Sequence, residues 1–129
     1  MLDPPDGFAP LFRTSPFLDV LGPFYHRRDG RALILGVRIA EKHCNARGTA
    51  HGGLLMTLAD IALGYSLAYA EDPPASLTTA NLSVDFAGSA KLGDWLEAAA
   101  PRPRDSRPGT RAPAPDRAAG RPRPPCRPA

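Results

Sequence analysis

The chain has 129 residues, a formal net charge of +3 and two cysteines, which is enough for one domain with a small core. The charge is divided unevenly: residues 1–98 hold 8 Lys and Arg against 11 Asp and Glu, whereas residues 99–129 hold 8 Arg against 2 Asp. The first part is therefore mildly acidic, so its charge does not support nucleic-acid binding, and we expect no nucleic-acid partner.

Cysteine usage and the N-terminus favour a cytoplasmic protein. Cys44 and Cys126 provide no disulfide framework, which fits a reducing compartment. Residues 1–12 show neither a basic nor a long apolar region, so we expect no signal peptide. The apolar run over residues 53–70 carries Asp60 at its centre and has no basic flanks, which favours a buried helix over a membrane span.

The first half of the chain shows a helix and two strands. Aromatic and aliphatic residues predict a short helix around residues 16–22. A strand is expected over residues 24–29, closed by a turn at Asp29-Gly30, and a second strand over residues 31–40. Residues 1–23 then form an N-terminal segment, and the folded domain extends over residues 24–98.

The second half begins with a loop and a long helix. Gly52-Gly53 lead into a helix that ends by about residue 70, before Asp72-Pro73-Pro74. Alternating apolar and polar residues predict a strand over residues 76–88, and another strand begins at Trp95.

The last 31 residues, 99–129, differ from the rest. They contain 9 of the 16 prolines and no Ile, Leu, Val, Met or aromatic residue, so they cannot bury enough apolar surface to fold and we expect disorder. One interpretation is a basic, proline-rich linker or interaction tail. We favour another, a frameshift product, because Arg, Pro, Ala and Gly are what GC-rich codons yield out of frame. Translating the other frames beyond Ala98 tests this hypothesis.

The most specific stretch runs from Asn45 to Gly53, with the letters NARGTAHGG, directly into the apolar helix. Glycines at a helix N-terminus let a ligand approach bare backbone N–H groups, where the helix dipole provides positive potential. Such donors stabilise a carbonyl oxygen that develops negative charge. The alternative is that Gly52-Gly53 only permit a tight turn from strand to helix.

Asp60 is the second notable feature, because a carboxylate on an apolar helix is costly unless it is paired, at an interface or used. Thr57, Asp60 and Gly64 share one small, polar face of the helix, opposite an apolar stripe of Leu54, Leu58, Ile61 and Tyr65. This face suits a close neighbour or a substrate cleft. The alternative is an acid that only complements the helix dipole, although Asp60 lies roughly two turns in, too deep for a large benefit.

Residues 24–98 resemble the hotdog-fold acyl-CoA thioesterases of the phenylacetate-degradation (PaaI-like) group. The resemblance rests on N-x-x-G-x-x-H-G-G at 45–53, L-x-D-x-A at 58–62, T-x-x-L-x-V-x-F at 79–86 and A-K-L-G-D at 90–94. It implies an α+β hotdog fold, a central apolar helix wrapped by a curved antiparallel sheet. The strands that complete this domain in the family are missing here, so the chain resembles a truncated domain.

The resemblance also implies roles for individual residues. The backbone N–H of Gly52, together with Gly53, stabilises the thioester oxygen. Asp60 acts across a dimer interface, as general base on water or as nucleophile, and these two roles stay open. A hydroxyl at Thr79 helps to hold water near the acid. Lys91 is a candidate contact for a CoA phosphate, although a solvated turn lysine is the plainer interpretation.

Asn45 either orients water or the thioester carbonyl, or is a turn residue. His51 is a weaker catalytic candidate, since its ring also fits a structural role before the helix. His43, Cys44 and His51 lack a fourth ligand at a usual spacing, so no metal is expected. No base is placed for Cys44 as a nucleophile, and no G-x-S-x-G is present.

The sequence thus predicts an acyl-CoA thioesterase that releases a free acid and CoA, with aryl or medium-chain acyl groups favoured. It requires no cofactor, because CoA is part of the substrate. The expected assembly is a homodimer or homotetramer, with no membrane partner. Two alternatives stay open: a non-catalytic truncated hotdog polypeptide, and an acyl-CoA-binding hotdog protein without turnover.

Overall fold

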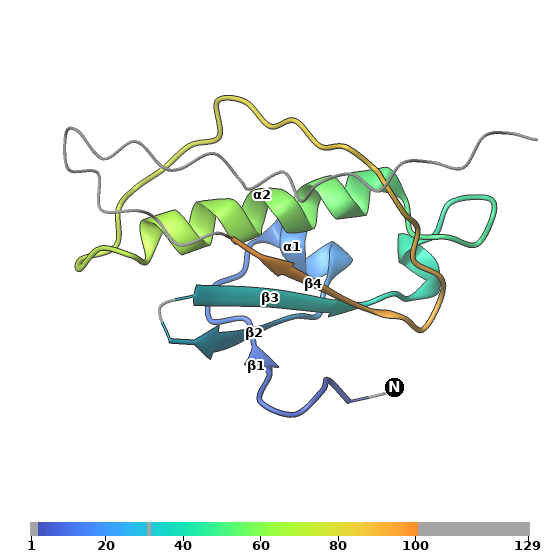
Figure 1. The fold of residues 1–129 in the computed structure, drawn as a ribbon, viewed down its shortest axis with the longest axis horizontal. Helices are drawn as coiled ribbons and strands as arrows, with labels where there is room; N and C mark the ends of the chain where they lie inside the picture. The colour runs from blue at the N-terminus through green and yellow to red at the C-terminus, as the bar shows by residue number, and fades with distance from the viewer. Residues whose placement is uncertain (1–2, 31, 101–129) are drawn as a thin grey trace, which may run out of the picture.

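The computed structural model describes residues 3–30 and 32–100. In this part of the chain a four-stranded antiparallel sheet packs against one face of a long helix, α2 (Figure 1). The helices are α1 (Pro16–Leu21), α2 (Gly52–Ala68) and the short 3-10 turn η1 (Glu41–His43). The strands are β1 (Ala9–Pro10), β2 (Phe24–Asp29), β3 (Ala32–Arg38) and β4 (Trp95–Ala99).

The sheet has the order β1-β2-β3-β4. The predicted strand over 24–29 is confirmed, and the one over 31–40 forms from Ala32 to Arg38. β3 pairs with β2 on one side and with β4 on the other, where Val37 lies opposite Leu96. The sequence did not reveal β1, because two residues are too short for a visible period.

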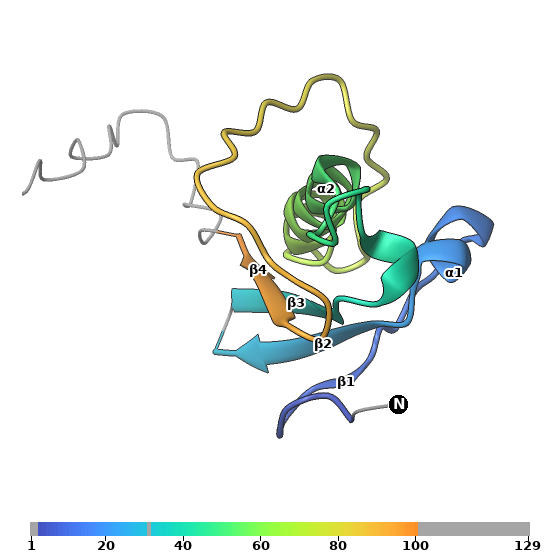
Figure 2. The same cartoon turned by 90° about the vertical axis from the view of Figure 1, so that its right-hand side faces the viewer.

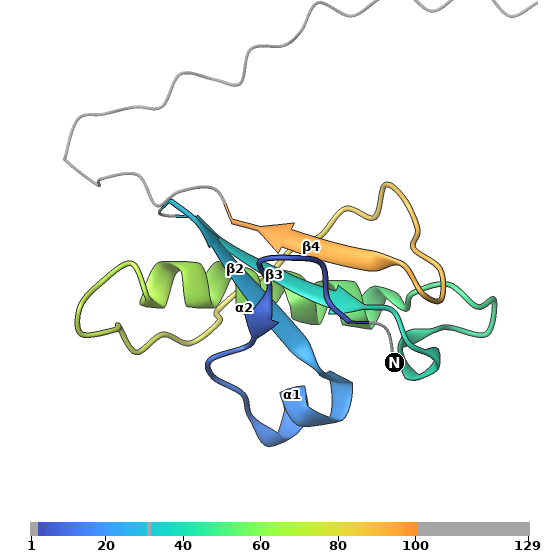
Figure 3. The same ribbon diagram turned by 90° about the horizontal axis from the view of Figure 1, so that it is seen from below.

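The core lies between the sheet and α2. β3 supplies Leu33, Leu35 and Val37 on alternate positions, as the two-residue period of a strand requires. α2 supplies Leu54, Leu58, Ile61 and Ala62. Figure 3, seen from the sheet side, shows β2 and β3 crossing in front of α2. The α+β architecture is therefore as predicted, and Leu54, Leu58 and Ile61 of the predicted apolar stripe are in the core, whereas Tyr65 is only partly buried at its margin.

The other face of the sheet is also packed, around the ring of Trp95. Phe8 meets this ring edge-on at a centroid distance of 5.0 Å, and the Arg38 guanidinium lies 5.3 Å from its centroid. Gly36 lies directly under the Trp95 ring, and a β-carbon there would collide with it. Glycine at this position is thus required by close approach rather than by backbone conformation.

The loop from β3 to α2 is anchored by a buried histidine. The His43 side chain is 3% exposed. Its Nδ1 accepts a hydrogen bond from the Ala40 N–H at 2.9 Å, so Nε2 carries the proton and donates to the Leu21 carbonyl at 2.5 Å. The His43 carbonyl in turn accepts from the His51 N–H. This ring therefore ties η1, the end of α1 and the start of α2 together.

The strand predicted over residues 76–88 is wrong. The structure has no strand there; instead the segment 71–89 runs back along the side of α2 away from the sheet (Figure 2). Leu82 and Val84 are half-buried and Ser83 is exposed, so the alternation is real. A strand also needs a neighbour for its backbone groups, and no other strand in the described part of the chain lies beside this segment.

Two further differences concern the helix and the tail. The sheet covers only one side of α2, so Met56, Leu63 and Leu67 are exposed rather than wrapped. β4 continues to Ala99, which pairs with Ile34, so the fold extends past residue 98. The expected disorder and frameshift origin concern residues that otherwise lie outside the described part of the chain, 101–129.

Candidate active site

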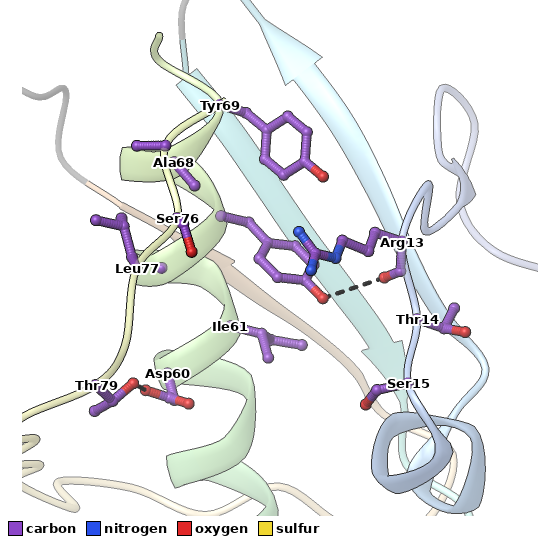
Figure 4. A pocket seen from close by; sticks show the side chains of 13 residues that line it. Arg13, Thr14, Ser15, Asp60, Ile61, Ala68, Tyr69, Ser76, Leu77 and Thr79 are labelled. Carbon is purple, nitrogen blue, oxygen red and sulfur yellow. Dashed lines mark hydrogen bonds between the residues drawn. The ribbon is translucent and has the colours of Figure 1, made fainter. Parts of the chain in front are cut away.

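The middle of α2 borders a pocket of about 300 Å³ between the helix, the Arg13–Ser15 segment and the chain after α2 (Figure 4). Asp60, Gly64 and Ala68 line it at intervals of one helical turn, and Ile61 and Tyr65 line it beside them. Asp60 and Gly64 of the predicted small face therefore form part of one wall of the pocket, without Thr57, and Ile61 and Tyr65 lie on the same side rather than on the opposite one.

Asp60 and Thr79 meet at one end of this pocket. The Thr79 hydroxyl donates a hydrogen bond of 2.6 Å to Asp60 Oδ1. Asp60 comes from the middle of α2 and Thr79 from the segment that runs beside it, 19 residues later. No protein group in residues 3–30 and 32–100 hydrogen-bonds the other carboxylate oxygen, Oδ2. The pair thus presents an aligned carboxylate to the pocket.

The N-terminus of α2 presents the backbone N–H of Gly52. The Gly53 N–H donates to His51 Nδ1 at 2.8 Å, and the next two amides bond to the His51 carbonyl. Within the described residues, the Gly52 N–H has no such partner. A β-carbon on Gly52 would lie 3.3 Å from the Phe86 ring, so glycine keeps this amide accessible beside an aromatic side chain.

His51 and Asn45 have structural roles in the loop. The His51 ring caps α2 through its bond to Gly53. Asn45 Oδ1 accepts from the Arg47 N–H at 2.9 Å, and its Nδ2 donates to the Thr49 hydroxyl at 2.9 Å. The left-handed backbone of Gly48 (φ +78°) completes this turn. Neither side chain hydrogen-bonds Asp60 or Thr79.

Lys91 lies away from the pocket, in the turn before β4. Its backbone N–H donates to Asp94 Oδ2 at 2.9 Å, and its backbone forms an isolated antiparallel β-bridge with Thr49. Its side chain is exposed. No group of three or more His, Cys, Asp and Glu side chains in the described residues is arranged to hold a metal ion.

The far end of the pocket contains residues that the sequence did not single out. The Tyr65 hydroxyl donates to the Arg13 carbonyl at 3.3 Å, which joins α2 to the N-terminal segment. Phe12 packs against Tyr65 and Tyr69, with its ring centroid 5.8 and 4.7 Å from theirs. Arg13 belongs to a different part of the sequence, so no local pattern could have placed it here.

Two groups at this end have shifted pKa values. Burial raises the pKa of the Tyr65 hydroxyl above its ordinary value, against the opposing effect of the Arg13 charge. The Tyr69 hydroxyl, followed by Tyr65, raises the pKa of the Arg13 guanidinium. Arg13 is therefore a permanent cation and Tyr65 a neutral hydroxyl at working pH.

A second cavity, of about 360 Å³, lies between the start of β2, the end of β3 and the turn before β4. It has two cations, but both are engaged with the backbone. Arg38 donates to the Gly93 and Asp3 carbonyls at 3.0 Å each, and Lys42 donates to the Gly22 carbonyl. Arg38 and Lys42 thus connect distant backbone segments by side-chain hydrogen bonds, and no such bond is found for the Arg13 side chain among the described residues.

A long helix that begins at glycine and packs on an antiparallel sheet is the arrangement of a hotdog-type domain, and here the helix carries a carboxylate that faces a pocket. Residues 47–100 match the family model described as Thioesterase superfamily. The chain is also 57% identical over 98 residues to a Pseudomonas aeruginosa protein named "Putative esterase PA0474". The matched residues make up 75% of this chain and 73% of that protein. The chain belongs to the thioesterase superfamily, and its hotdog fold is confirmed. In the described residues, no helix is both long and apolar enough to cross a membrane.

Proposed function

We propose that the protein hydrolyses acyl-CoA thioesters to a free acid and CoA, by the chemistry of PaaI-like hotdog enzymes. The observation that carries the proposal is the 2.6 Å hydrogen bond from the Thr79 hydroxyl to Asp60 at the pocket wall. A hydroxyl that donates to one carboxylate oxygen fixes the plane of the carboxylate and leaves the other oxygen for water or for the thioester carbon.

The proposed oxyanion donor is the backbone N–H of Gly52. It begins α2, where the dipole favours negative charge, and the neighbouring Gly53 N–H is already used by His51. A β-carbon on Gly53 would lie 3.1 Å from His51 Nδ1, so we propose that glycine there lets the His51 ring cap the helix start beside the Gly52 amide. Asn45 supports the loop, and Lys91 is available to a CoA phosphate at the surface.

The distance between Gly52 and Asp60 within one chain supports a site shared by two copies. Gly52 and Asp60 are eight residues apart on one helix, which separates them by roughly 12 Å along its axis. One thioester carbonyl cannot contact both. We therefore assign the amide of one chain and the carboxylate of its partner to each site, in a homodimer. The exposed Met56, Leu63 and Leu67 on α2 suit an apolar interface.

The pocket walls favour aryl or medium-chain acyl groups, because Ile61, Tyr65 and Leu77 provide apolar surface beside Asp60. No cofactor takes part, since water is the second substrate. A free thiol at Cys44 is compatible with the proposed cytoplasmic location.

Release of CoA thiol from a panel of acyl-CoAs tests this proposal on the full chain. Asp60→Asn is expected to lower kcat by roughly 10²–10⁴-fold, the usual contribution of general acid–base catalysis. Asp85→Asn, an exposed acid on the neighbouring segment, is the matched control and keeps wild-type activity. If wild type binds acyl-CoA without releasing CoA, the protein is a binding protein without turnover. If Asp60→Asn keeps full activity, Asp60 is not the catalytic acid.

A further inference from the structure

The pocket beside α2 carries opposite charges at its two ends. Asp60 lies with Thr79 at one end, and Arg13 approaches from the N-terminal segment at the other, with Tyr69 above it (Figure 4). We propose that the acyl group of the substrate ends in a second carboxylate, and that Arg13 binds this carboxylate. The proposal rests on the proposed thioester hydrolysis, and names its substrate class: coenzyme A half-thioesters of dicarboxylic acids.

Arg13 has donors available for such a group. The Arg13 side chain is exposed, and Asp60 at the opposite end is the one acidic residue among the described residues that line the pocket. A guanidinium presents several N–H donors in a planar fork, so one hydroxyl partner leaves room for a carboxylate to bind with both oxygens. The backbone of Arg13 is held in place by the Tyr65 hydroxyl.

The path between the two ends is open. Gly64 lies one turn beyond Asp60, and a β-carbon there would meet no atom within 4 Å. Ala68 lies one turn further, and both residues line the pocket. Two turns of helix span roughly 12 Å, which is room for an acyl chain of several carbons.

The charges also set the orientation of such a substrate. Asp60 repels a carboxylate, so the free acid end is directed away from it and toward Arg13. The thioester end, which carries no charge, then lies beside Asp60. A neutral acyl chain of the same length gains no binding free energy from Arg13, because it would desolvate the guanidinium without pairing its charge.

The test compares adipoyl-CoA with hexanoyl-CoA, which have the same number of carbons, on the full chain. Wild type is expected to prefer adipoyl-CoA in kcat/KM by about tenfold, the scale of one charge-assisted hydrogen bond, and added salt should reduce this preference. Arg13→Gln is expected to abolish the preference, mainly by raising KM for adipoyl-CoA. Arg28→Gln, an exposed arginine on β2, is the matched control and keeps the preference.

Gly64→Leu tests whether the acyl group lies in this pocket at all. Leucine favours a helix over glycine, so the variant is expected to fold. It should lower kcat/KM for both substrates by filling the open path. If both rates stay at the wild-type value, the acyl group lies elsewhere and the proposal is overturned.

Two other outcomes also overturn it. In the first, Arg13→Gln lowers kcat/KM equally for both acyl-CoAs and has no effect on acyl-pantetheine substrates, which lack the CoA phosphates. This result would mean that Arg13 binds a CoA phosphate. In the second, wild type shows no preference for adipoyl-CoA.

Binding separates this proposal from the proposed function. Analogues with CH₂ in place of the thioester sulfur cannot be hydrolysed, and calorimetry measures their affinity without turnover. If wild type cleaves no acyl-CoA but binds the adipoyl analogue more tightly than the hexanoyl one, dependent on Arg13, hydrolysis fails and the carboxylate site stands. If both analogues bind equally, the carboxylate site fails whether or not hydrolysis occurs.

Discussion

The two sides of α2 are built in opposite ways. On one side the sheet packs Leu35 and Val37 against the helix, and both side chains have no exposed surface. On the other side the segment 71–89 makes two hydrogen bonds to the helix, from the Ala75 N–H to the Ala68 carbonyl and from Thr79 to Asp60, and most of its side chains are exposed. Core packing makes the sheet side rigid, while the other side leaves room for a ligand.

The loop before α2 belongs to the rigid side. Its polar side chains satisfy one another or the backbone: His43 with Ala40 and Leu21, and Asn45 with Thr49. The polar side chains of this loop thus mostly hold the loop in place, and the loop presents one backbone amide at its end. The difference teaches that a motif can hold two kinds of residue, those that build a site and those that act in it.

The largest effect is expected where the rigid loop meets the site. Gly52→Pro removes the proposed oxyanion N–H, yet proline is well tolerated as the first residue of a helix, and the extended backbone of His51 (ψ 139°) suits a following proline. We expect kcat to fall by roughly 10²–10³-fold, the usual effect of one oxyanion donor. Gly52→Ala is the control, because it keeps the N–H and adds the same first carbon beside Phe86.

Complementation extends this experiment to the dimer. Gly52→Pro and Asp60→Asn are each expected to be nearly inactive, but co-expression of the two should restore activity, since a mixed dimer contains one intact site. The activity of the purified mixed dimer is measured by CoA release. If mass spectrometry shows mixed dimers but their CoA-release activity does not recover, the Gly52 amide and the Asp60 carboxylate do not form a site shared by two chains.

The next effect concerns the stability of the loop. His43→Ala leaves the Ala40 N–H and the Leu21 carbonyl without their buried partner, and is expected to lower the free energy of unfolding by about 2 kcal/mol or more. His51→Ala removes only an exposed helix cap, and should cost about 1 kcal/mol. Urea unfolding followed by circular dichroism measures both. Equal losses would contradict the anchoring role of His43.

A pair of glycines compares the packed and the open parts directly. Gly36→Ala drives a methyl group into the Trp95 ring and is expected to destabilise the fold by about 1–3 kcal/mol. Gly64→Ala meets no atom within 4 Å and should stabilise α2 by up to about 1 kcal/mol. Thermal unfolding measures the two variants. If Gly36→Ala keeps the wild-type stability, the Trp95 ring can move aside at little cost in free energy.

The smallest effect is expected for the hydroxyl that orients Asp60. Thr79→Val removes its hydrogen bond and keeps the shape of the side chain, so kcat should fall by about tenfold while KM stays unchanged. Thr78→Val, its exposed neighbour, is the control and leaves both constants unchanged. A rise in KM alone would assign Thr79 to substrate binding instead.

Secondary-structure elements that are marked by short stretches of sequence could be predicted without the structure. The turn at Asp29-Gly30, the two-residue period of β3 and the glycine start of α2 each need only neighbouring residues, so β2, β3 and α2 were predicted within a few residues. Asp60 was also visible locally, because a charge interrupts an apolar helix. Its partner Thr79 was reached only through the resemblance to a family.

Features that depend on residues far apart in the chain became visible in the fold alone. The alternation over residues 76–88 is real, but a strand forms only beside a partner, and the described part of the chain places none there. The hydrogen bonds that hold the His51 and Asn45 side chains within the loop are likewise not visible in the sequence, and their predicted roles in the site stay predictions. Arg13 faces the pocket because α1 and β2 fold the N-terminal segment back onto α2, a contact between residues about 50 positions apart.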